Sequence, residues 1–280
     1  MRAIIRNLLL TALPVGAFYL YASRIEPHWL DVKSIEIVLP RLDPAFDGYR
    51  IAQFSDIHMD SHMTPARLQT VVERVNAHQP DLTVITGDFI TRRTHYVADD
   101  ITAVLRQLHA ADGVLAIPGN HDYYNYQIDN VRRMMRDSGI TDLSNRVHSI
   151  KRGEAQLHIC GVDDVVYRKA RLDLVLADLP DDGAAILLAH EPDFADISAP
   201  TGRFDLQLSG HTHGGQIRLP LAGALISPTH GTRYSRGLLD IDGMWLYTNV
   251  GVGTVSFSLR FNCRPEITVF TLRAPVTYPE

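Results

Sequence analysis

The chain has 280 residues, of which 45% are hydrophobic and 21% are charged, enough for one large globular domain or two small ones. Its formal net charge of −5 disfavours a nucleic acid as the main partner, because nucleic-acid binding usually requires a basic face. The sequence has two cysteines, Cys160 and Cys263, and buried free thiols are favoured over a disulfide.

Residues 1–23 form an apolar segment that differs from the rest of the chain. The run Leu8 to Ala22 follows Arg2 and Arg6 and precedes Arg24. It is short for a spanning helix, which needs roughly 17–25 apolar residues, and its signal-peptide cleavage site is poor. An uncleaved anchor, an interfacial segment and a cleaved signal all remain open. We expect a membrane-associated protein, with the side of the membrane undecided.

Residues 24–48 are expected to be a connector with one strand, and residues 49–280 a catalytic domain that begins with a βαβ pattern. The connector strand is predicted at Ser34 to Leu39. The next strands are predicted at Arg50 to Phe54, Asp81 to Thr86 and Val114 to Ile117, and the helices at Pro65 onward with Thr64 as cap, at Ile101 to Leu108 with Gly113 as its end, and at Gln127 to Ser138. Strands that alternate with amphipathic helices indicate a mostly parallel sheet covered by helices.

The second half of the chain is richer in strands. Strands are predicted at Gln156 to Gly161, Ala185 to Leu188, Phe204 to Leu208, Leu238 to Tyr247 around an Asp242-Gly243 turn, and Ile267 to Leu272, with a helix around Leu172 to Leu179. The expected arrangement is two sheets that face each other, with helices on their outer sides. The sequence therefore predicts an α/β fold.

Potential metal ligands occur in five short blocks, each directly after a predicted strand. The blocks are Asp56-Ile57-His58, Gly87-Asp88, Gly119-Asn120-His121-Asp122, His190, and Gly210-His211-Thr212-His213. In such sheets, ligands gather beyond the carboxyl ends of the strands. The first two blocks alone are weak signals, the third is moderately specific and the glycine-flanked His211 and His213 are a strong one, and together the blocks predict a metal centre.

The ligand types and their spacing indicate which ions the site takes. Asp, Asn and His without Cys suit Mn²⁺, Fe²⁺ or Zn²⁺. Seven ligands exceed one tetrahedral site and fit two ions that share a bridging carboxylate. Asp56 and His58 would share one face of an extended backbone. The glycines around His211 and His213 would let the chain fold tightly around a cation.

Across residues 50 to 215 the five blocks resemble the calcineurin-like metallophosphoesterase superfamily. The resemblance implies a four-layer α/β sandwich, with two facing mixed sheets flanked by helices, that holds two divalent metal ions. It implies that Asp56, His58, Asp88 and His213 bind the first ion, and that Asp88, Asn120, His190 and His211 bind the second. His121 would be the catalytic histidine beside the leaving group, with Asp122 as its partner.

A finer resemblance is to a membrane-associated bacterial branch of phosphodiesterases and UDP-2,3-diacylglucosamine pyrophosphatases. It is carried by the N-terminal apolar segment, by Gly214 to Pro220 and by Cys263 to Glu266. It implies a location at the bacterial inner membrane and hydrolysis of a phosphodiester or pyrophosphate bond in a nucleotide-linked lipid.

Other functions and one apolar stretch remain open. A phosphodiesterase of soluble substrates and a catalytically silent, metal-bound interaction module are the alternatives. A nuclease is disfavoured by the acidic charge. Leu219 to Ile226 is either a buried strand or loop, or a lipid-facing lip over the site.

Overall fold

The computed structural model describes residues 13–91 and 98–276, and its centre is a pair of facing six-stranded sheets. In spatial order the first sheet contains β1 (Asp31–Val38), β14 (Glu266–Arg273), β2 (Arg50–Phe54), β3 (Leu82–Thr86), β4 (Val114–Ile117) and β5 (Thr141–Asp142). The second contains β12 (Gly237–Ile241), β13 (Met244–Thr248), β9 (Leu206–Ser209), β8 (Ala184–Leu188), β7 (Ala155–Gly161) and β6 (Arg146–Arg152). Both sheets mix parallel and antiparallel pairs.

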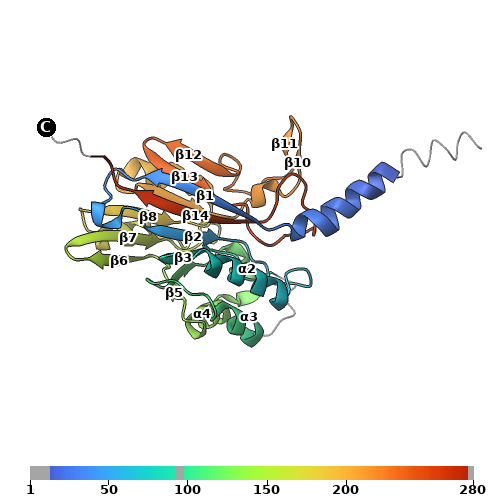
Figure 1. The fold of residues 1–280 in the computed structure, drawn as a ribbon, viewed down its shortest axis with the longest axis horizontal. Coiled ribbons are helices and arrows are strands. Elements are labelled where there is room, and N and C mark those ends of the chain that lie inside the picture. Colours follow the sequence, from blue (N-terminus) through green and yellow to red (C-terminus); the bar gives the residue numbers. More distant parts are fainter. Residues whose placement is uncertain (1–12, 92–97, 277–280) are drawn as a thin grey trace, which may run out of the picture.

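Helices cover the outer faces of both sheets, so the fold is the predicted four-layer α/β sandwich (Figure 1). Helices α2 (Pro65–Ala77), α3 (Ala98–Leu105) and α4 (Ile128–Asp137) pack on the first sheet, whereas α5 (Leu172–Asp178) and α6 (Ala195–Ser198) pack on the second. Between the sheets, aliphatic side chains such as Val84 and Leu115 meet Ile186 and Leu208 in the central core. Burial of this apolar surface fixes the two sheets against each other and thereby sets which strand ends meet.

The start of α2 follows from its sequence. The Thr64 hydroxyl accepts a hydrogen bond from the Arg67 backbone N–H at 3.3 Å, and Pro65 is the first helical residue. The predicted apolar face, Leu68, Val71, Val72 and Val75, is buried. This helix therefore holds the segment after β2 against the first sheet.

One local prediction is wrong, and one strand was not predicted. Helix α3 ends at Leu105, and Gly113, with φ of 91°, lies at the turn into β4 instead of ending the helix. Strand β6 was not predicted, because its sequence RVHSIKR is polar and partly exposed. It is held by antiparallel pairing with β7, in which Ile150 lies opposite Leu157.

The connector strand and the predicted hairpin each lie at the edge of a sheet. Strand β1 pairs in parallel with β14 at the edge of the first sheet, so residues 31–38 belong to the sandwich. The predicted hairpin is formed by β12 and β13. Its turn residues Asp242 and Gly243 have φ of 52° and 88°, the conformation that favours Asp-Gly in tight hairpins.

The predicted N-terminal segment lies partly outside the described residues. Residues 13–20 are helical, and the π-helix η1 (Tyr21–Ile25) follows. Within the described ranges, no helix combines the length and apolar character needed to cross a membrane. Cys160 and Cys263 are both free and buried, as predicted.

Candidate metal centre

The five predicted ligand blocks meet at one edge of the sandwich, because each follows the carboxyl end of a neighbouring strand. The first sheet supplies the blocks after β2, β3 and β4, and the second supplies those after β8 and β9. The two sheets are joined here by a hydrogen bond from Gln53 Nε2 to the Ser209 carbonyl at 3.1 Å. Seven side chains that are far apart in the sequence thereby converge.

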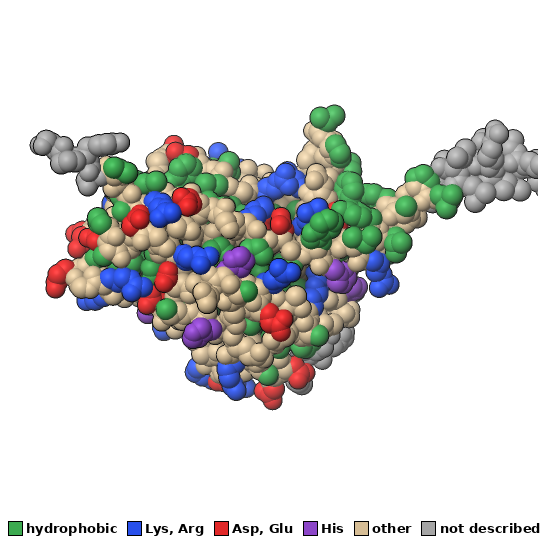
Figure 2. Space-filling view, in the orientation of Figure 1, with side chains coloured by type: hydrophobic (Ala, Val, Ile, Leu, Met, Phe, Trp, Pro, Cys, Tyr) green, Lys and Arg blue, Asp and Glu red, His purple; other side chains and the backbone are tan. Residues whose placement is uncertain are grey.

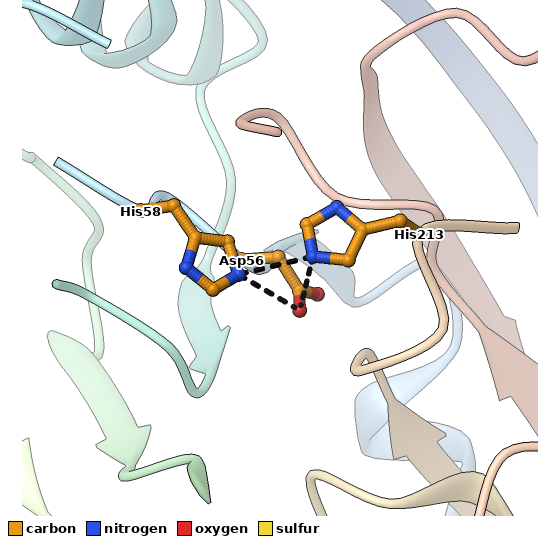
Figure 3. A group of neighbouring side chains, drawn as sticks. All are labelled: Asp56, His58 and His213. Atoms are coloured by element: carbon orange, nitrogen blue, oxygen red, sulfur yellow. Dashed lines mark hydrogen bonds and ion pairs between the residues drawn. The ribbon is translucent and has the colours of Figure 1, made fainter. Parts of the chain in front are cut away.

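One group consists of Asp56, His58 and His213, all buried (Figure 3). The Nε2 atoms of the two imidazoles are 3.0 Å apart. Asp56 Oδ1 lies 3.3 Å from Nε2 of His213 and 3.8 Å from Nε2 of His58. Bonds of about 2.1 Å to a tetrahedral ion would place ligand atoms roughly 3.4 Å apart, which matches these separations.

A second group consists of Asn120, His190 and His211. His190 Nδ1 donates to the Thr86 carbonyl at 2.6 Å, which leaves its Nε2 for a metal. His211 Nε2 donates to the Thr229 carbonyl at 2.8 Å, and its Nδ1 lies 3.0 Å from Asn120 Oδ1. Carbonyl groups therefore orient both imidazoles, as partners of metal-bound histidines do.

Asp88 lies between the two groups. Its Oδ2 is 3.4 Å from Nε2 of His58 in the first group and 3.2 Å from Nε2 of His190 in the second. Its Oδ1 accepts the backbone N–H of His121 at 2.8 Å, which fixes the carboxylate plane. One carboxylate oxygen therefore faces both groups, in the position a bridging ligand requires.

The backbone reaches these positions by left-handed turns. Positive φ angles occur at five of the predicted ligands: Asp56 (53°), His58 (49°), Asp88 (59°), His211 (70°) and His213 (49°). The prediction that Asp56 and His58 lie on one extended face is therefore wrong. Non-glycine residues rarely adopt this conformation, and such strain gathers at functional sites where the surrounding structure holds it.

Burial and charge set the protonation of the ligands. Burial lowers the pKa of His58 and of His211 to about 3, so both imidazoles are neutral at neutral pH, the form that binds metal. Burial alone would lower the pKa of His190, but the Asp88 carboxylate raises it well above the usual value. Burial also raises the pKa of Asp56 to about 7. A bound cation would restore the ionised carboxylate.

The donor set fits divalent ions. His190 Nε2 is buried and has no hydrogen-bond partner among the described residues, although it faces the Asp88 carboxylate. Buried polar atoms normally have partners, and a metal ion would supply one here. Imidazoles, carboxylates and an amide are the ligands of Mn²⁺, Fe²⁺ and Zn²⁺. The groups therefore match the chemistry of such ions.

His121 lies beside the predicted ligands and is less buried than they are. Its ring centroid is 4.7 Å from that of His58 and 4.6 Å from that of Tyr124. One of its ring nitrogens lies within 4.8 Å of ligand atoms of His58 and Asp88. A partly exposed imidazole in this place can meet a substrate that approaches from solvent.

Asp122 has a different environment from the one predicted. Its carboxylate accepts backbone N–H groups of Asp88, Phe89, Ile90 and Gly119 at 2.9 to 3.2 Å. These bonds tie the segment after β3 to the segment after β4. The structure therefore gives Asp122 the role of positioning the backbone of Asp88, and not that of orienting the His121 imidazole.

Gly119 is required by a close approach and not by its backbone angles. A Cβ at this position would overlap the Asp88 carboxylate, and it would lie 2.7 Å from Nε2 of His190. We expect Gly119→Ala to lower metal affinity by about 10- to 100-fold, because it displaces two predicted ligands. Metal titration monitored by calorimetry measures the loss.

The control for Gly119→Ala is Gly16→Ala, since a Cβ at residue 16, in the N-terminal helix, meets nothing within 4 Å. This control should leave metal affinity unchanged and should slightly favour the helix. Equal metal affinity in the Gly119 variant and the parent would show that Asp88 and His190 do not bind the metal.

Arg260 is a buried residue that sequence reasoning missed. Its guanidinium donates to the carbonyls of Val250, Gly251, Gly253 and Cys263 at 2.6 to 3.2 Å. Gly253 in turn donates its N–H to the Asp56 carbonyl at 2.8 Å. Arg260 thus holds the loop that supports the backbone of Asp56. Nothing near it in the sequence marks this role, because its partners are all backbone carbonyls.

We expect Arg260→Met to lower the free energy of unfolding by roughly 3 kcal/mol, because it leaves several buried carbonyls without donors. It should also weaken metal binding, since the support of Asp56 is lost. Urea unfolding and metal titration on the same sample measure both effects.

Arg203 provides a matched control, because its guanidinium also donates to backbone carbonyls, those of Pro180, Asp182 and Gly183. Arg203→Met should cost stability and leave metal affinity as in the parent. If both variants weakened metal binding equally, Arg260 would have no specific effect on the site.

The convergence of these histidine, carboxylate and amide ligands is that of a metal-dependent phosphoesterase. Comparisons with known proteins agree with it. Residues 49–215 match the family described as calcineurin-like phosphoesterase. The chain is 37% identical over 265 residues to the uncharacterized metallophosphoesterase YkuE of Bacillus subtilis, covering 94% of this chain and 92% of the relative. It is 28% identical over 255 residues to the phosphodiesterase YaeI of Escherichia coli, covering 90% and 92%.

A third relative is a Bos taurus transmembrane protein with a metallophosphoesterase domain, 30% identical over 260 residues that cover 87% of this chain and 57% of the relative. The chain belongs to the calcineurin-like phosphoesterase family. It is therefore a metal-dependent hydrolase that acts on phosphoric ester bonds.

Proposed function

We propose that the chain hydrolyses a phosphodiester or diphosphate bond with two divalent ions that share Asp88. Asp56, His58 and His213 would complete the first ion site, and Asn120, His190 and His211 the second. When bound, such ions orient the phosphoryl group, offset its negative charge and lower the pKa of a water molecule. The observation that carries the proposal is the position of Asp88 Oδ2, within 3.4 Å of an imidazole nitrogen in each group.

His121 is the residue we place beside the leaving group. Its backbone N–H bonds to Asp88 and its ring contacts His58, so the imidazole is held next to both ion sites. From there it donates a proton to the leaving oxygen as the bond to phosphorus breaks. General acids contribute about 10²–10⁴-fold to such steps. Asp122 supports this arrangement through the backbone of Asp88.

We infer further that one side of the scissile phosphate carries a lipid, as in nucleotide-linked lipids such as UDP-diacylglucosamine. The support is the apolar stretch Leu219 to Ile226, which begins six residues after His213 and is largely exposed in the structure. A soluble diester would gain nothing from such a surface. An acyl chain would lose its contact with water there.

A hydrolysis screen tests the proposal. Nucleotide-diphospho-lipids and bis-p-nitrophenyl phosphate are compared with Mn²⁺ present, and metal content is measured on the same sample. We expect turnover of both, with the larger kcat/KM for a lipid substrate. Turnover of the soluble diester alone would indicate a general phosphodiesterase. Two bound ions without any turnover would indicate a metal-bound interaction module.

A further inference from the structure

The N-terminal helix leaves the sandwich at one end of the molecule (Figure 1), and an exposed apolar surface lies there. We call it the apolar rim. It comprises the hairpin β10 (Arg218–Leu219) and β11 (Gly223–Ala224) with its flanks, the helix at residues 13–20, and the loop at residues 255–261. Its exposed side chains include Tyr19, Leu20, Leu221, Leu225, Ile226 and Phe257. Figure 2 shows hydrophobic side chains over the hairpin and the helix, with Lys and Arg side chains beside them.

The three parts of the apolar rim are joined to one another. The ring of Phe261 lies 4.8 Å from that of Phe18 in the helix. The Phe261 backbone pairs with the start of the hairpin, because its carbonyl accepts the Arg218 N–H at 2.9 Å. Gln216 Nε2 donates to the carbonyls of Val255 and Phe257 at 3.0 and 3.2 Å. The rim is therefore a built surface and not a set of independent loops.

Exposure at the hairpin is extreme for aliphatic residues. Leu221, which has φ of 69°, is fully exposed, and Ile226 is 69% exposed. Single exposed leucines are common on proteins, but a contiguous group marks an interaction site. The left-handed backbone conformation of Leu221 at the hairpin tip costs free energy. Because the Leu221 side chain is exposed, no burial in the described structure offsets this cost.

Cationic side chains lie at the base of the rim. A cavity of about 510 Å³ between the hairpin and the N-terminal segment is lined by Pro220, Phe261, Arg236 and Arg264, among others. The Arg264 guanidinium lies 3.6 Å from the ring centroid of Trp29, which is half exposed. Three acidic residues line the same cavity: Glu26 accepts the Cys263 N–H, Glu266 pairs with Lys33, and Asp31 is the third. Among the described residues neither Arg236 nor Arg264 forms an ion pair, so both guanidinium groups can meet an external anion.

We propose that the apolar rim inserts into an anionic phospholipid bilayer, with Arg236 and Arg264 meeting the lipid phosphates. Apolar side chains next to two arginines, one of which stacks on a tryptophan, match the chemistry of a bilayer surface. The apolar run Leu8 to Ala22 continues directly into the rim, which argues for a membrane over a soluble partner. The inference extends the proposed lipid-linked substrate, because the rim follows the last predicted ligands in the chain.

Vesicle co-sedimentation of the full chain tests the proposal without any turnover, so its failure can be told from a failure of the proposed function. Vesicles of phosphatidylcholine alone are compared with an equimolar mixture with phosphatidylglycerol. We expect tighter binding to the mixture. The double variant Leu221→Asp/Ile226→Asp should weaken that binding at least about tenfold, because two apolar side chains no longer enter the lipid.

Two further variants separate the contributions. Arg236→Gln and Arg264→Gln should each lower binding to the anionic mixture by about fivefold and leave binding to phosphatidylcholine unchanged. Val276→Asp is the matched control: Val276 is 77% exposed and follows the end of β14 that pairs with Val38, away from the Glu266 end that lines the cavity. It should bind like the parent. The melting temperature of every variant checks its fold.

Two outcomes would overturn the proposal. Parental binding by the double variant would mean that the N-terminal run alone holds the membrane. A dimer of the parent in sedimentation equilibrium that the double variant abolishes, without vesicle binding by either, would assign the rim to a second copy of the chain.

Discussion

Asp88→Ala is expected to lose both metal ions and to lower kcat/KM by at least about 10³-fold, since bound ions contribute several kcal/mol to phosphoryl transfer. The reason is geometric: Asp88 Oδ2 faces His58 of one group and His190 of the other. Removal of this oxygen leaves each group with one ligand fewer. Metal content by mass spectrometry and turnover of bis-p-nitrophenyl phosphate measure the two effects.

Two variants control this experiment. Asp88→Asn keeps an oxygen that can accept the His121 N–H but removes the negative charge, so it should retain the fold and still bind the ions weakly. Asp205→Ala removes another buried carboxylate, which pairs with Arg41 at 3.1 Å, and should lower stability without lowering metal content. Retention of two ions per chain by Asp88→Ala would show that Asp88 does not bridge them.

His121→Ala is expected to retain both ions and to lower turnover by about 10²–10⁴-fold, the range of a lost general acid. The loss should depend on the leaving group. A p-nitrophenolate needs little help from an acid, whereas an alkoxide needs much, so the variant should lose more activity on an alkyl diester than on bis-p-nitrophenyl phosphate. Steady-state rates with both substrates measure this difference.

His158→Ala is the matched control, because this buried imidazole bonds to Ser149 at 2.8 Å and to the Asp182 carbonyl at 3.1 Å, within β7 and its surroundings. It should affect stability and leave the ratio of the two rates unchanged. If His121→Ala slowed both substrates equally, His121 would position the substrate or the ions instead of protonating the leaving group.

The sequence was sufficient to locate the ligand blocks, because each follows a short apolar strand and strand ends are where such folds gather side chains. The parallel neighbours β2, β3 and β4 follow the same alternation of strands and helices, whereas the place of β14 between β1 and β2 does not. The extended geometry expected for Asp56 and His58 is wrong, because both have positive φ angles and their backbone N–H groups bond to the carbonyls of Gly87 and Asp88 after the next strand. Local sequence carries no record of such contacts.

Other features depend on distant parts of the chain. Arg260 supports Asp56 through Gly253, a connection between residues about 200 positions apart in the sequence. The family resemblance implied Asp122 as the partner of His121, but its carboxylate accepts four backbone N–H groups. An apolar stretch such as Leu219 to Ile226 is compatible with a buried core and with a lipid-facing surface. The exposure of its side chains in the fold distinguishes the two.

Anomalous diffraction from crystals grown with Mn²⁺ tests the central claim most directly, because it locates the ions relative to named side chains. We expect two peaks about 3.5–4 Å apart, one on either side of Asp88 Oδ2, the first against Asp56, His58 and His213 and the second against Asn120, His190 and His211. A single peak, or peaks that do not contact Asp88, would contradict the account.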